Sequence, residues 1–250
     1  MSCVIIELDS IDSTNWEACR RIEKGVTDGT IITAYKQTNG QARRGRRWDS
    51  PPGNLYWSRV VFPKLGWPLP STLSMISALA VVDLVRLVLP SDVSICIKWP
   101  NDILIAGNKL AGILLQSGEK GSTPWVICGI GVNLASSLSI KPPYPVTDLQ
   151  SCGAVTIDRK YLAYDLARHF NRRLADYLKW GMVAIHDAVL KNLVGIGNFV
   201  TVCINNRRED DVSGRFCGLD DQCRAEILTV DGKKRVISAG DLFLHSGINK

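Results

Sequence analysis

The chain has 250 residues, of which 46% are hydrophobic and 22% charged, a composition that fits a well-packed domain with a smaller second unit and excludes a disordered or fibrous protein. Thirty Lys and Arg residues against 24 Asp and Glu residues leave a net charge of +6. Five of the basic residues, and no acidic one, lie in the segment 36–47, so the excess predicts one local anion site and argues against a nucleic-acid-binding surface spread over the whole protein.

The first predicted elements surround this basic segment. A helix is predicted over 14–25, where Thr14 and Glu17 have the spacing of a capping box and Gly25 is a C-terminal stop. The N-terminus lacks a basic flank followed by a long apolar core, so we expect no secretory signal peptide and a cytoplasmic location. Strands are predicted at 4–8, 29–35 and 54–62, on either side of a basic loop at 37–48.

The middle of the chain alternates between one apolar helix and several strands. Polar residues, among them Asp83 and Arg86, interrupt the most apolar stretch, 73–89, which predicts a buried helix and not a membrane span. Strands are predicted at 93–98, 103–105, 110–116 and 125–134. Several successive strands before the next helix indicate an α+β domain with a mixed or antiparallel sheet.

The C-terminal third begins with two predicted helices. The first begins near Asp158 and ends at Gly181, and its apolar stripe follows helical spacing; the second covers 185–193. A boundary is predicted at the glycines of 195–197, which divides the chain into 1–195 and 196–250. Four short strands, at 199–204, 212–219, 225–230 and 235–238, predict a small β-barrel in the second part.

The cysteines and histidines offer little for metal or nucleophilic chemistry. The eight cysteines form no Cys-x-x-Cys pair, and only three histidines are present. We therefore expect free, mostly buried thiols, and neither a zinc site nor a His-based catalytic triad.

The basic loop is the first segment that can bind a ligand. Its glycines let backbone approach a ligand closely, and its guanidinium groups can hold phosphate or carboxylate oxygens in bidentate geometry. Two interpretations stay open on this evidence, a small-molecule phosphate site and a nucleic-acid contact.

Two further segments carry polar groups beside strands. Lys98-Trp99-Pro100-Asn101-Asp102 offers an amide and a carboxylate at a turn, which suit Mg²⁺ and phosphate contacts, and the segment 109–114 brings a lysine into a strand with small residues. An ordinary edge hairpin is the alternative. The glycines at 129–133 do not form a dinucleotide fingerprint, because the third glycine and the following helix are missing.

Together these segments resemble the biotin protein ligases, over about 5–149, and the C-terminal part fits the small SH3-like domain of the same family. The resemblance rests on their order along the chain: the segments 12–15, 40–48, 50–58, 98–102, 109–114 and 129–133. Trp-Pro-Asn-Asp followed by Lys-Leu-Ala-Gly-Ile-Leu is the most discriminating combination. The resemblance implies a biotin/lipoate ligase catalytic domain of the class II aminoacyl-tRNA synthetase type, followed by an SH3-like β-barrel.

The resemblance also implies a reaction in two steps. Biotin and ATP, with Mg²⁺, form biotinyl-5′-adenylate and pyrophosphate, and a lysine of a biotin carboxyl carrier protein then attacks the activated carbonyl. Such an enzyme needs no covalent nucleophile, since its task is positioning and charge stabilisation.

Site residues follow from the resemblance, position by position. Arg43 and Lys109 match catalytic positions. Biotin-binding positions are Ser13, Thr14, Asn15, Gln37, Gly40, Gln41, Ala42, Arg43, Lys109 and Gly112. Positions for ATP and the adenylate are Arg43, Arg46, Trp48, Asn101 and Asn133. Magnesium ligands are expected at Asn101 and Asp102.

The chain departs from the family in its loop, where Gln41 and Ala42 stand in place of an arginine and a glycine. Since alanine tolerates positive φ less well than glycine, we expect the loop to close differently. The first motif begins at residue 12, which predicts a ligase without an N-terminal DNA-binding domain, and a homodimer is one expected assembly. A lipoate or octanoate ligase or transferase on the same fold is the rival enzyme, and a nucleic-acid-binding module is the rival of another class.

Overall fold

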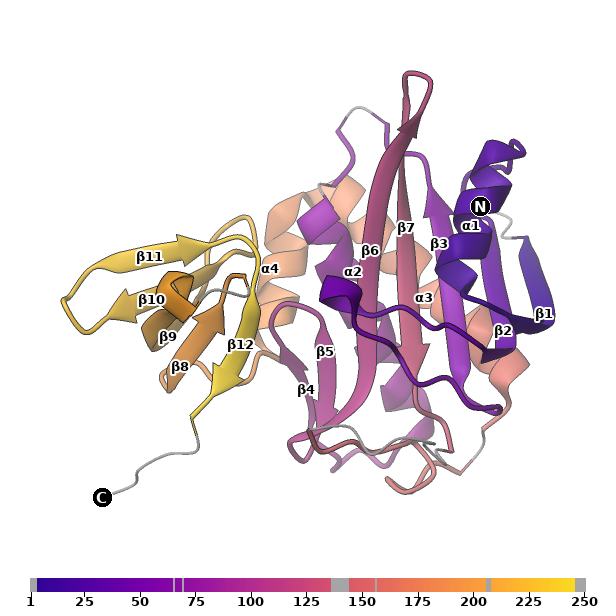
Figure 1. Cartoon of the computed structure of the whole chain (residues 1–250). Coiled ribbons are helices and arrows are strands. Elements are labelled where there is room, and N and C mark those ends of the chain that lie inside the picture. Colours follow the sequence, from indigo (N-terminus) through magenta and orange to yellow (C-terminus); the bar gives the residue numbers. More distant parts are fainter. Residues whose placement is uncertain are drawn as a thin grey trace.

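A seven-stranded sheet forms the larger part of the computed structural model, and a five-stranded sheet lies toward the C-terminus (Figure 1). The larger sheet has the strand order β1-β2-β3-β7-β6-β5-β4, and only its β1–β2 pair is parallel. The predicted mixed sheet is therefore confirmed. The structure describes residues 4–64, 66–68, 70–135, 144–155, 157–205 and 208–245.

The larger sheet and its helices follow the predicted order. Its elements are β1 (Ile5–Ile11), α1 (Thr14–Glu23), β2 (Ile31–Gln37), β3 (Leu55–Val61), α2 (Pro70–Val88), β4 (Ile95–Lys98), β5 (Asp102–Ile105), β6 (Asn108–Lys120), β7 (Thr123–Val132), α3 (Arg159–Trp180) and α4 (Met182–Leu190). The main differences from prediction are the longer β1 and β6 and an earlier start of α4.

Both faces of the sheet carry helices. Neighbouring residues of a strand point to opposite faces, so Ile32 packs with Ala18 and Ile22 of α1, whereas Ile31 joins the larger core formed with α2 and α3. The loop after β2 crosses the α1 face of the sheet, in front of β6 and β7 (Figure 1). This face therefore holds both the start of α1 and the basic loop.

The apolar helix predicted at 73–89 is α2. Most of its residues are buried, which confirms the predicted buried helix. Within the described residues it is also the single helix whose length and composition would let it cross a membrane.

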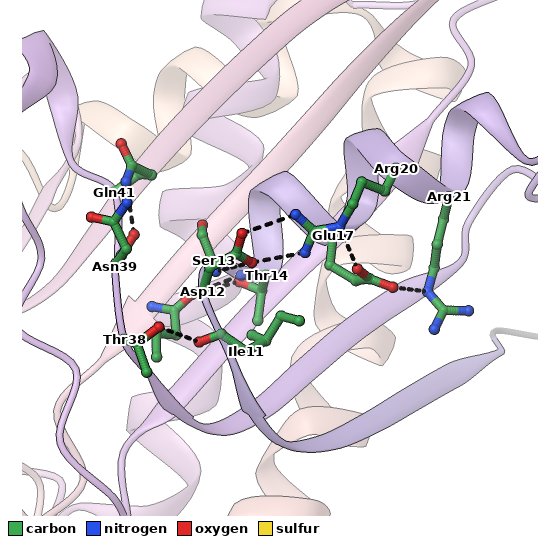
Figure 2. Close-up of polar contacts among 11 residues, drawn as sticks. Ile11, Asp12, Ser13, Thr14, Glu17, Arg20, Arg21, Thr38, Asn39 and Gln41 are labelled. Atoms are coloured by element: carbon green, nitrogen blue, oxygen red, sulfur yellow. Dashed lines mark hydrogen bonds and ion pairs between the residues drawn. The ribbon is translucent and has the colours of Figure 1, made fainter.

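The N-terminal end of α1 differs from the prediction. Ser13 is the N-cap residue and its side chain makes no capping hydrogen bond, so the predicted Thr14–Glu17 capping box is wrong. The Thr14 hydroxyl lies 3.2 Å from Gln37 Oε1, while Glu17 forms ion pairs with Arg20 and Arg21 along the helix (Figure 2). The Gln37 side chain, at the end of β2, accepts the Thr14 backbone N–H in place of a local capping residue.

The C-terminal sheet is antiparallel throughout, in the order β11-β10-β9-β8-β12. The predicted turn at Asp231-Gly232 joins β10 and β11, with Gly232 at a φ of 78°. The fifth strand was not predicted, and closure into an SH3-like barrel stays a prediction. The strands are β8 (Phe199–Cys203), β9 (Val212–Leu219), β10 (Ala225–Thr229), β11 (Lys234–Ile237) and β12 (Asp241–Leu244).

The cysteines are free, as predicted, in the part of the chain that the structure describes. Of the seven cysteines that the structure describes, only Cys128 and Cys223 are buried, and Cys217 is exposed, so the expectation of mostly buried thiols is wrong. Cys3 lies outside the described residues.

A buried carboxylate joins the two helices behind the sheet. Asp83 of α2 accepts hydrogen bonds from Arg173 Nε and Nη2 of α3, at 2.7 and 2.8 Å, and Arg172 Nη2 lies 2.8 Å from the same carboxylate. Burial alone would raise the pKa of Asp83, but the two arginines outweigh it and hold that pKa below its ordinary value. The carboxylate therefore stabilises the fold in its charged form.

We expect Asp83→Asn to lower the free energy of unfolding at pH 7 by about 2 kcal/mol, because charged hydrogen bonds to Arg173 are lost. A lowered pKa in the folded state gives stability that is present above the unfolded pKa of about 3.9 and lost as the pH falls through the folded value. The gap between wild type and variant, measured by urea unfolding, should therefore narrow below about pH 4. A gap independent of pH would contradict the assignment.

Candidate active site

A cavity of about 1150 Å³ lies on the α1 face of the larger sheet. Its walls come from the start of α1, the end of β2, the basic loop, strands β4 to β7 and the C-terminal strand β12. Every residue that the sequence predicted for the site lines this cavity: Ser13, Thr14, Asn15, Gln37, Gly40, Gln41, Ala42, Arg43, Arg46, Trp48, Asn101, Asp102, Lys109, Gly112 and Asn133.

One end of the cavity is a network of uncharged polar groups. Gln37 Oε1 accepts a 2.8 Å hydrogen bond from the Thr14 backbone N–H, and its Nε2 donates to Ser50 Oγ. Ser58 Oγ lies 2.7 Å from Thr14 Oγ1 and 2.6 Å from Asn15 Oδ1. Such a set of hydroxyl and amide groups suits a small neutral ligand with both donors and acceptors.

Asn15 is placed by both its partners and its surroundings. Its Nδ2 donates to Gln116 Oε1 at 2.9 Å, and its side chain lies against Gly129 of β7. A Cβ at Gly129 would lie only 2.9 Å from Asn15 Cγ. The glycine therefore makes the room in which the amide of Asn15 reaches the cavity.

The chain between β1 and α1 is held from outside the cavity. Asp12 accepts the backbone N–H of Ser13 at 2.7 Å and forms an ion pair with Arg20 of α1, also at 2.7 Å (Figure 2). The hydrogen bond from Arg20 lowers the pKa of Asp12. These two contacts of Asp12 hold the backbone at Ser13 and Thr14, whose side chains line the cavity.

The basic loop forms a tight turn across the cavity. Ala42 N donates to Arg46 O at 2.8 Å and Trp48 N to Gly40 O at 2.9 Å, around a single 3₁₀ turn at Arg43–Gly45. Ala42 itself has a φ of −129°, an extended conformation open to any residue. The expectation that alanine would make the loop close differently through its φ is therefore wrong.

The positive φ angles of the loop fall elsewhere, at Arg44 (57°) and Gly45 (70°). Gln41 donates from Nε2 to Asn39 O within the loop, at 2.7 Å (Figure 2). The missing arginine is thus replaced by a neutral side chain that supports the loop backbone.

Three arginines of the loop gather around one carboxylate of the C-terminal sheet. Arg43 Nη1 lies 2.9 Å from Asp241 Oδ1, Arg46 Nη2 lies 2.8 Å from Oδ2, and Arg44 Nη1 lies 3.7 Å from Oδ2. Burial lowers the pKa of Arg43, while the charge of Asp241 opposes that shift. The strand β12 therefore anchors the loop.

Arg43 also links the loop to the turn between β4 and β5. Its Nη1 donates to Asn101 Oδ1 at 3.1 Å and to Gly240 O at 2.9 Å. Asn101 in turn donates from Nδ2 to Ile113 O. The guanidinium group thus lies where the larger sheet, the loop and the C-terminal sheet meet.

Lys109, in β6, lines the cavity. Its Nζ pairs with Asp102 Oδ1 at 2.7 Å and lies 5.1 Å from the ring centre of Trp48. The Trp48 indole rests on the bare backbone of the paired Gly112 and Gly131, where a Cβ would lie within 2.9 Å of the ring. An aromatic surface and an ammonium group therefore stand side by side over the glycines of β6 and β7.

The two residues predicted for Mg²⁺ differ in what they offer. Asn101 uses both ends of its amide within the protein, and its oxygen faces the Arg43 guanidinium, so it does not fit a metal ligand. Asp102 keeps a carboxylate at the cavity and fits as a single ligand of an ion that phosphates and water would otherwise surround. Within the described residues, His, Cys, Asp and Glu form no cluster of three that could hold a metal.

Asn133 lies at the end of β7 and is buried. Its Nδ2 donates to Thr147 O at 3.0 Å, and its backbone N–H donates to Leu110 O. Tyr144, which sequence reasoning did not single out, lines the same part of the cavity with its ring 5.3 Å from Lys109 Nζ.

Comparisons with known proteins identify the family. The model of the biotin/lipoate A/B protein ligase family matches residues 8–133, and that of the biotin protein ligase C terminal domain matches residues 196–244. A biotin–[acetyl-CoA-carboxylase] ligase of Paracoccus denitrificans is 33% identical over 237 residues, which cover 93% of this chain and 97% of the relative. The chain belongs to the biotin protein ligase family.

Two further members of the biotin protein ligase family extend the comparison. A bifunctional ligase/repressor of Escherichia coli is 31% identical over 96% of this chain and 73% of its own length. The structure of a biotin protein ligase from Aquifex aeolicus, in complex with biotin and ATP, is 25% identical and has a TM-score of 0.79, covering 97% of this chain and 98% of that one.

Sequence reasoning missed several residues that line the cavity or hold the side chains that line it. Ser58 and Gln116 complete the polar network from strands β3 and β6, and Asp241 holds the loop from β12. Ser58 lay within a motif quoted for the family. Asp241 stands in a four-residue strand and contacts residues about 200 positions away, so no local pattern identifies it.

We expect Asp241→Asn to loosen the loop of this biotin protein ligase family member when no ligand is present. Losing the charge leaves Arg43 and Arg46 without their shared anion, so the backbone amides of Ala42 and Trp48 should exchange with deuterium about tenfold faster. Asp231→Asn, in the β10–β11 turn, is the matched control and should leave the loop unchanged. Equal exchange in all three proteins would show that Asp241 does not hold the loop.

Proposed function

We propose that this protein is an ATP-dependent biotin protein ligase. Biotin and ATP form biotinyl-5′-adenylate and pyrophosphate, and the adenylate is then attacked by a lysine of a biotin carboxyl carrier protein, with release of AMP. One observation carries the proposal: a single cavity joins an uncharged polar pocket at α1 to a cluster of cations around Lys109 and Arg43. This arrangement suits a neutral ring at one end of a ligand and a charged group at the other.

The ring of biotin belongs at the polar end of the cavity. Thr14, Asn15 and Gln37 offer hydroxyl and amide groups, in fixed orientations, to a ureido group. Gly112 leaves room for the Trp48 indole and the Lys109 side chain over β6, so both can face the ligand. Ser13, Gly40, Gln41 and Ala42 complete this wall of the cavity.

The carboxylate and the adenylate phosphate belong at the cations. Lys109 lines the same cavity, with its Nζ 5.1 Å from the ring centre of Trp48 in the loop, so its ammonium group can bridge the biotin carboxylate and the α-phosphate, while Arg43 and Arg46 hold the phosphate from the loop side. Trp48, which lies against the glycines of β6 and β7, offers its ring to the ligand as an aromatic wall. Charge that develops at the α-phosphate is thereby stabilised by groups already in place.

The nucleotide belongs beside Asn101 and Asn133, which line the cavity. A Mg²⁺ ion carried by ATP would neutralise phosphate charge and could take Asp102 as one ligand. In the second step the protein holds the mixed anhydride while the carrier lysine attacks its carbonyl carbon and AMP departs. No nucleophile from the chain is required.

The rival interpretations differ in what they require. A nucleic-acid module would need the loop arginines on an open basic face, but Arg43, Arg44 and Arg46 all surround Asp241. A lipoate or octanoate ligase would use the same cations without a hydrogen-bonding ring. The network around Asn15, Thr14 and Ser58 favours biotin, because a ureido ring can form hydrogen bonds to such polar groups and an aliphatic chain cannot.

The choice between biotin and the aliphatic acids lipoate and octanoate is tested by measuring pyrophosphate release with each of them. With ATP and Mg²⁺, we expect biotin to support release at a rate at least 100-fold above that with lipoate or octanoate. Release with lipoate alone would overturn the proposal.

Three related proposals remain. The division of the chain at residues 195 and 196 is supported by the two separate sheets. A homodimer and a cytoplasmic location stay predictions.

A further inference from the structure

Lys98 is a basic residue of the cavity that the proposed roles leave unused. It is the last residue of β4, is partly buried, and lines the cavity next to β12. In the register of the sheet it stands directly opposite Asp102, so both side chains lie on the cavity face. Its Nζ lies 5.6 Å from the ring centre of Phe243 in β12.

The other cations around Lys98 already have anionic partners. Lys109 is paired with Asp102, and the loop arginines share Asp241. Among the described residues, none forms a hydrogen bond or ion pair with the Lys98 ammonium group, and burial lowers the pKa of this group. A partly desolvated cation without a partner is costly unless a ligand supplies an anion.

The in-line geometry of the proposed reaction indicates which anionic group of the ligand would lie at Lys98. In the proposed binding mode the biotin ring occupies the α1 end of the cavity, and its carboxylate lies at Lys109 on β6. When the carboxylate attacks the α-phosphate in line, the leaving group departs on the opposite side. In the strand order β3-β7-β6-β5-β4, that side is β4, where Lys98 lies.

We propose that Lys98 binds the β- and γ-phosphates of ATP and the pyrophosphate that leaves, a role that rests on the proposed ligase function. A bond forms between a biotin carboxylate oxygen and the α-phosphorus, and the bond from that phosphorus to the bridging oxygen breaks. The electron pair goes to pyrophosphate, and the Lys98 ammonium group balances its charge. The second step, which contains no pyrophosphate, does not involve Lys98.

Two half-reactions measured separately test this role. Lys98→Met keeps the apolar stem against Phe243 and removes the charge, Lys98→Arg keeps the charge, and Lys179→Met removes an equal charge from the end of α3 as a control. The first readout is biotin-dependent exchange of labelled pyrophosphate into ATP. The second is transfer to a carrier domain from biotinyl-5′-adenylate supplied ready-made.

We expect Lys98→Met to raise the KM for pyrophosphate at least tenfold, while its transfer rate from supplied adenylate stays within twofold of wild type. Lys98→Arg should recover most of the exchange, and Lys179→Met should match wild type in both assays. An unchanged KM for pyrophosphate, or equal losses in both half-reactions, would overturn the role of Lys98. If wild type itself showed no biotin-dependent exchange, the ligase function would fail instead.

Discussion

Lys109→Met is expected to slow formation of biotinyl-5′-adenylate by at least 100-fold, measured as pyrophosphate released in a single turnover with saturating biotin and ATP. Lys109 lines the cavity, where it is paired with Asp102 at 2.7 Å and lies over the Trp48 ring. Losing one preorganised donor to developing charge typically costs a factor of about 10² to 10³ in rate.

We expect an effect of this size because, among the described residues, Lys109 alone forms an ion pair with Asp102. The Lys109 side chain is only 14% exposed, and its removal leaves Asp102 Oδ1 buried without its partner. Two negative charges, the carboxylates of Asp102 and biotin, would then face the α-phosphate. Lys109→Arg should recover part of the rate, since it restores charge with altered reach. A Lys109→Met enzyme with the wild-type rate would remove Lys109 from the chemistry.

Arg43→Gly is expected to release the adenylate about 100-fold faster and to raise biotinylation of proteins that are not carriers. Arg43 makes three polar contacts, to Asn101 Oδ1, Gly240 O and Asp241 Oδ1, that hold the loop over the cavity. A charge-assisted contact contributes roughly 1.5 to 3 kcal/mol, which corresponds to about a tenfold to 100-fold change in retention. The dissociation rate of labelled adenylate gives the direct measurement.

Arg47→Gly is the matched control, because it removes the same group from the same loop. Arg47 donates to the loop backbone at Thr38 O and takes no part in the cluster around Asp241. We expect its adenylate to dissociate within about threefold of the wild-type rate. Equal release from both variants would mean that loop flexibility, and not the Arg43 contacts, controls retention.

The sequence allowed the local elements and the members of the site to be predicted. Each cavity segment carries its own pattern of glycines, prolines and polar residues, so the loop, the β4–β5 turn and the strands β6 and β7 could be placed before their arrangement was known. The resemblance then supplied the roles of Arg43 and Lys109. The fold places all of these predicted positions around one cavity.

What could not be predicted depends on contacts across the fold. From the sequence alone, the hydroxyl of Thr14 could bond either to the backbone at the start of its own helix or to a distant side chain. The pairing of β1 with β2 brings Gln37 next to Thr14, and the hydroxyl bonds to Gln37. Ala42 looked strained, but the positive φ falls at Arg44 and Gly45. Asn101 was predicted to be a metal ligand, but its Oδ1 accepts a hydrogen bond from Arg43.

The C-terminal strand β12 is the clearest case. It has four residues, Asp241–Leu244, and the strand with which it pairs, β8, lies about 40 residues earlier. The local sequence pattern of β12 does not distinguish it from an irregular C-terminal segment. Its importance comes from Asp241, which anchors the loop, and from Phe243, which lies beside Lys98.

The most direct test of the ligase function is transfer to an acceptor. The full chain is incubated with biotin, ATP, Mg²⁺ and a biotin carboxyl carrier domain, and the carrier is analysed by intact mass and peptide mapping, with lipoate in a parallel reaction. We expect one biotin on one carrier lysine, one AMP formed for each biotin transferred, and no modification with lipoate. A carrier that stays unmodified with biotin, or that is modified with lipoate alone, would contradict the account.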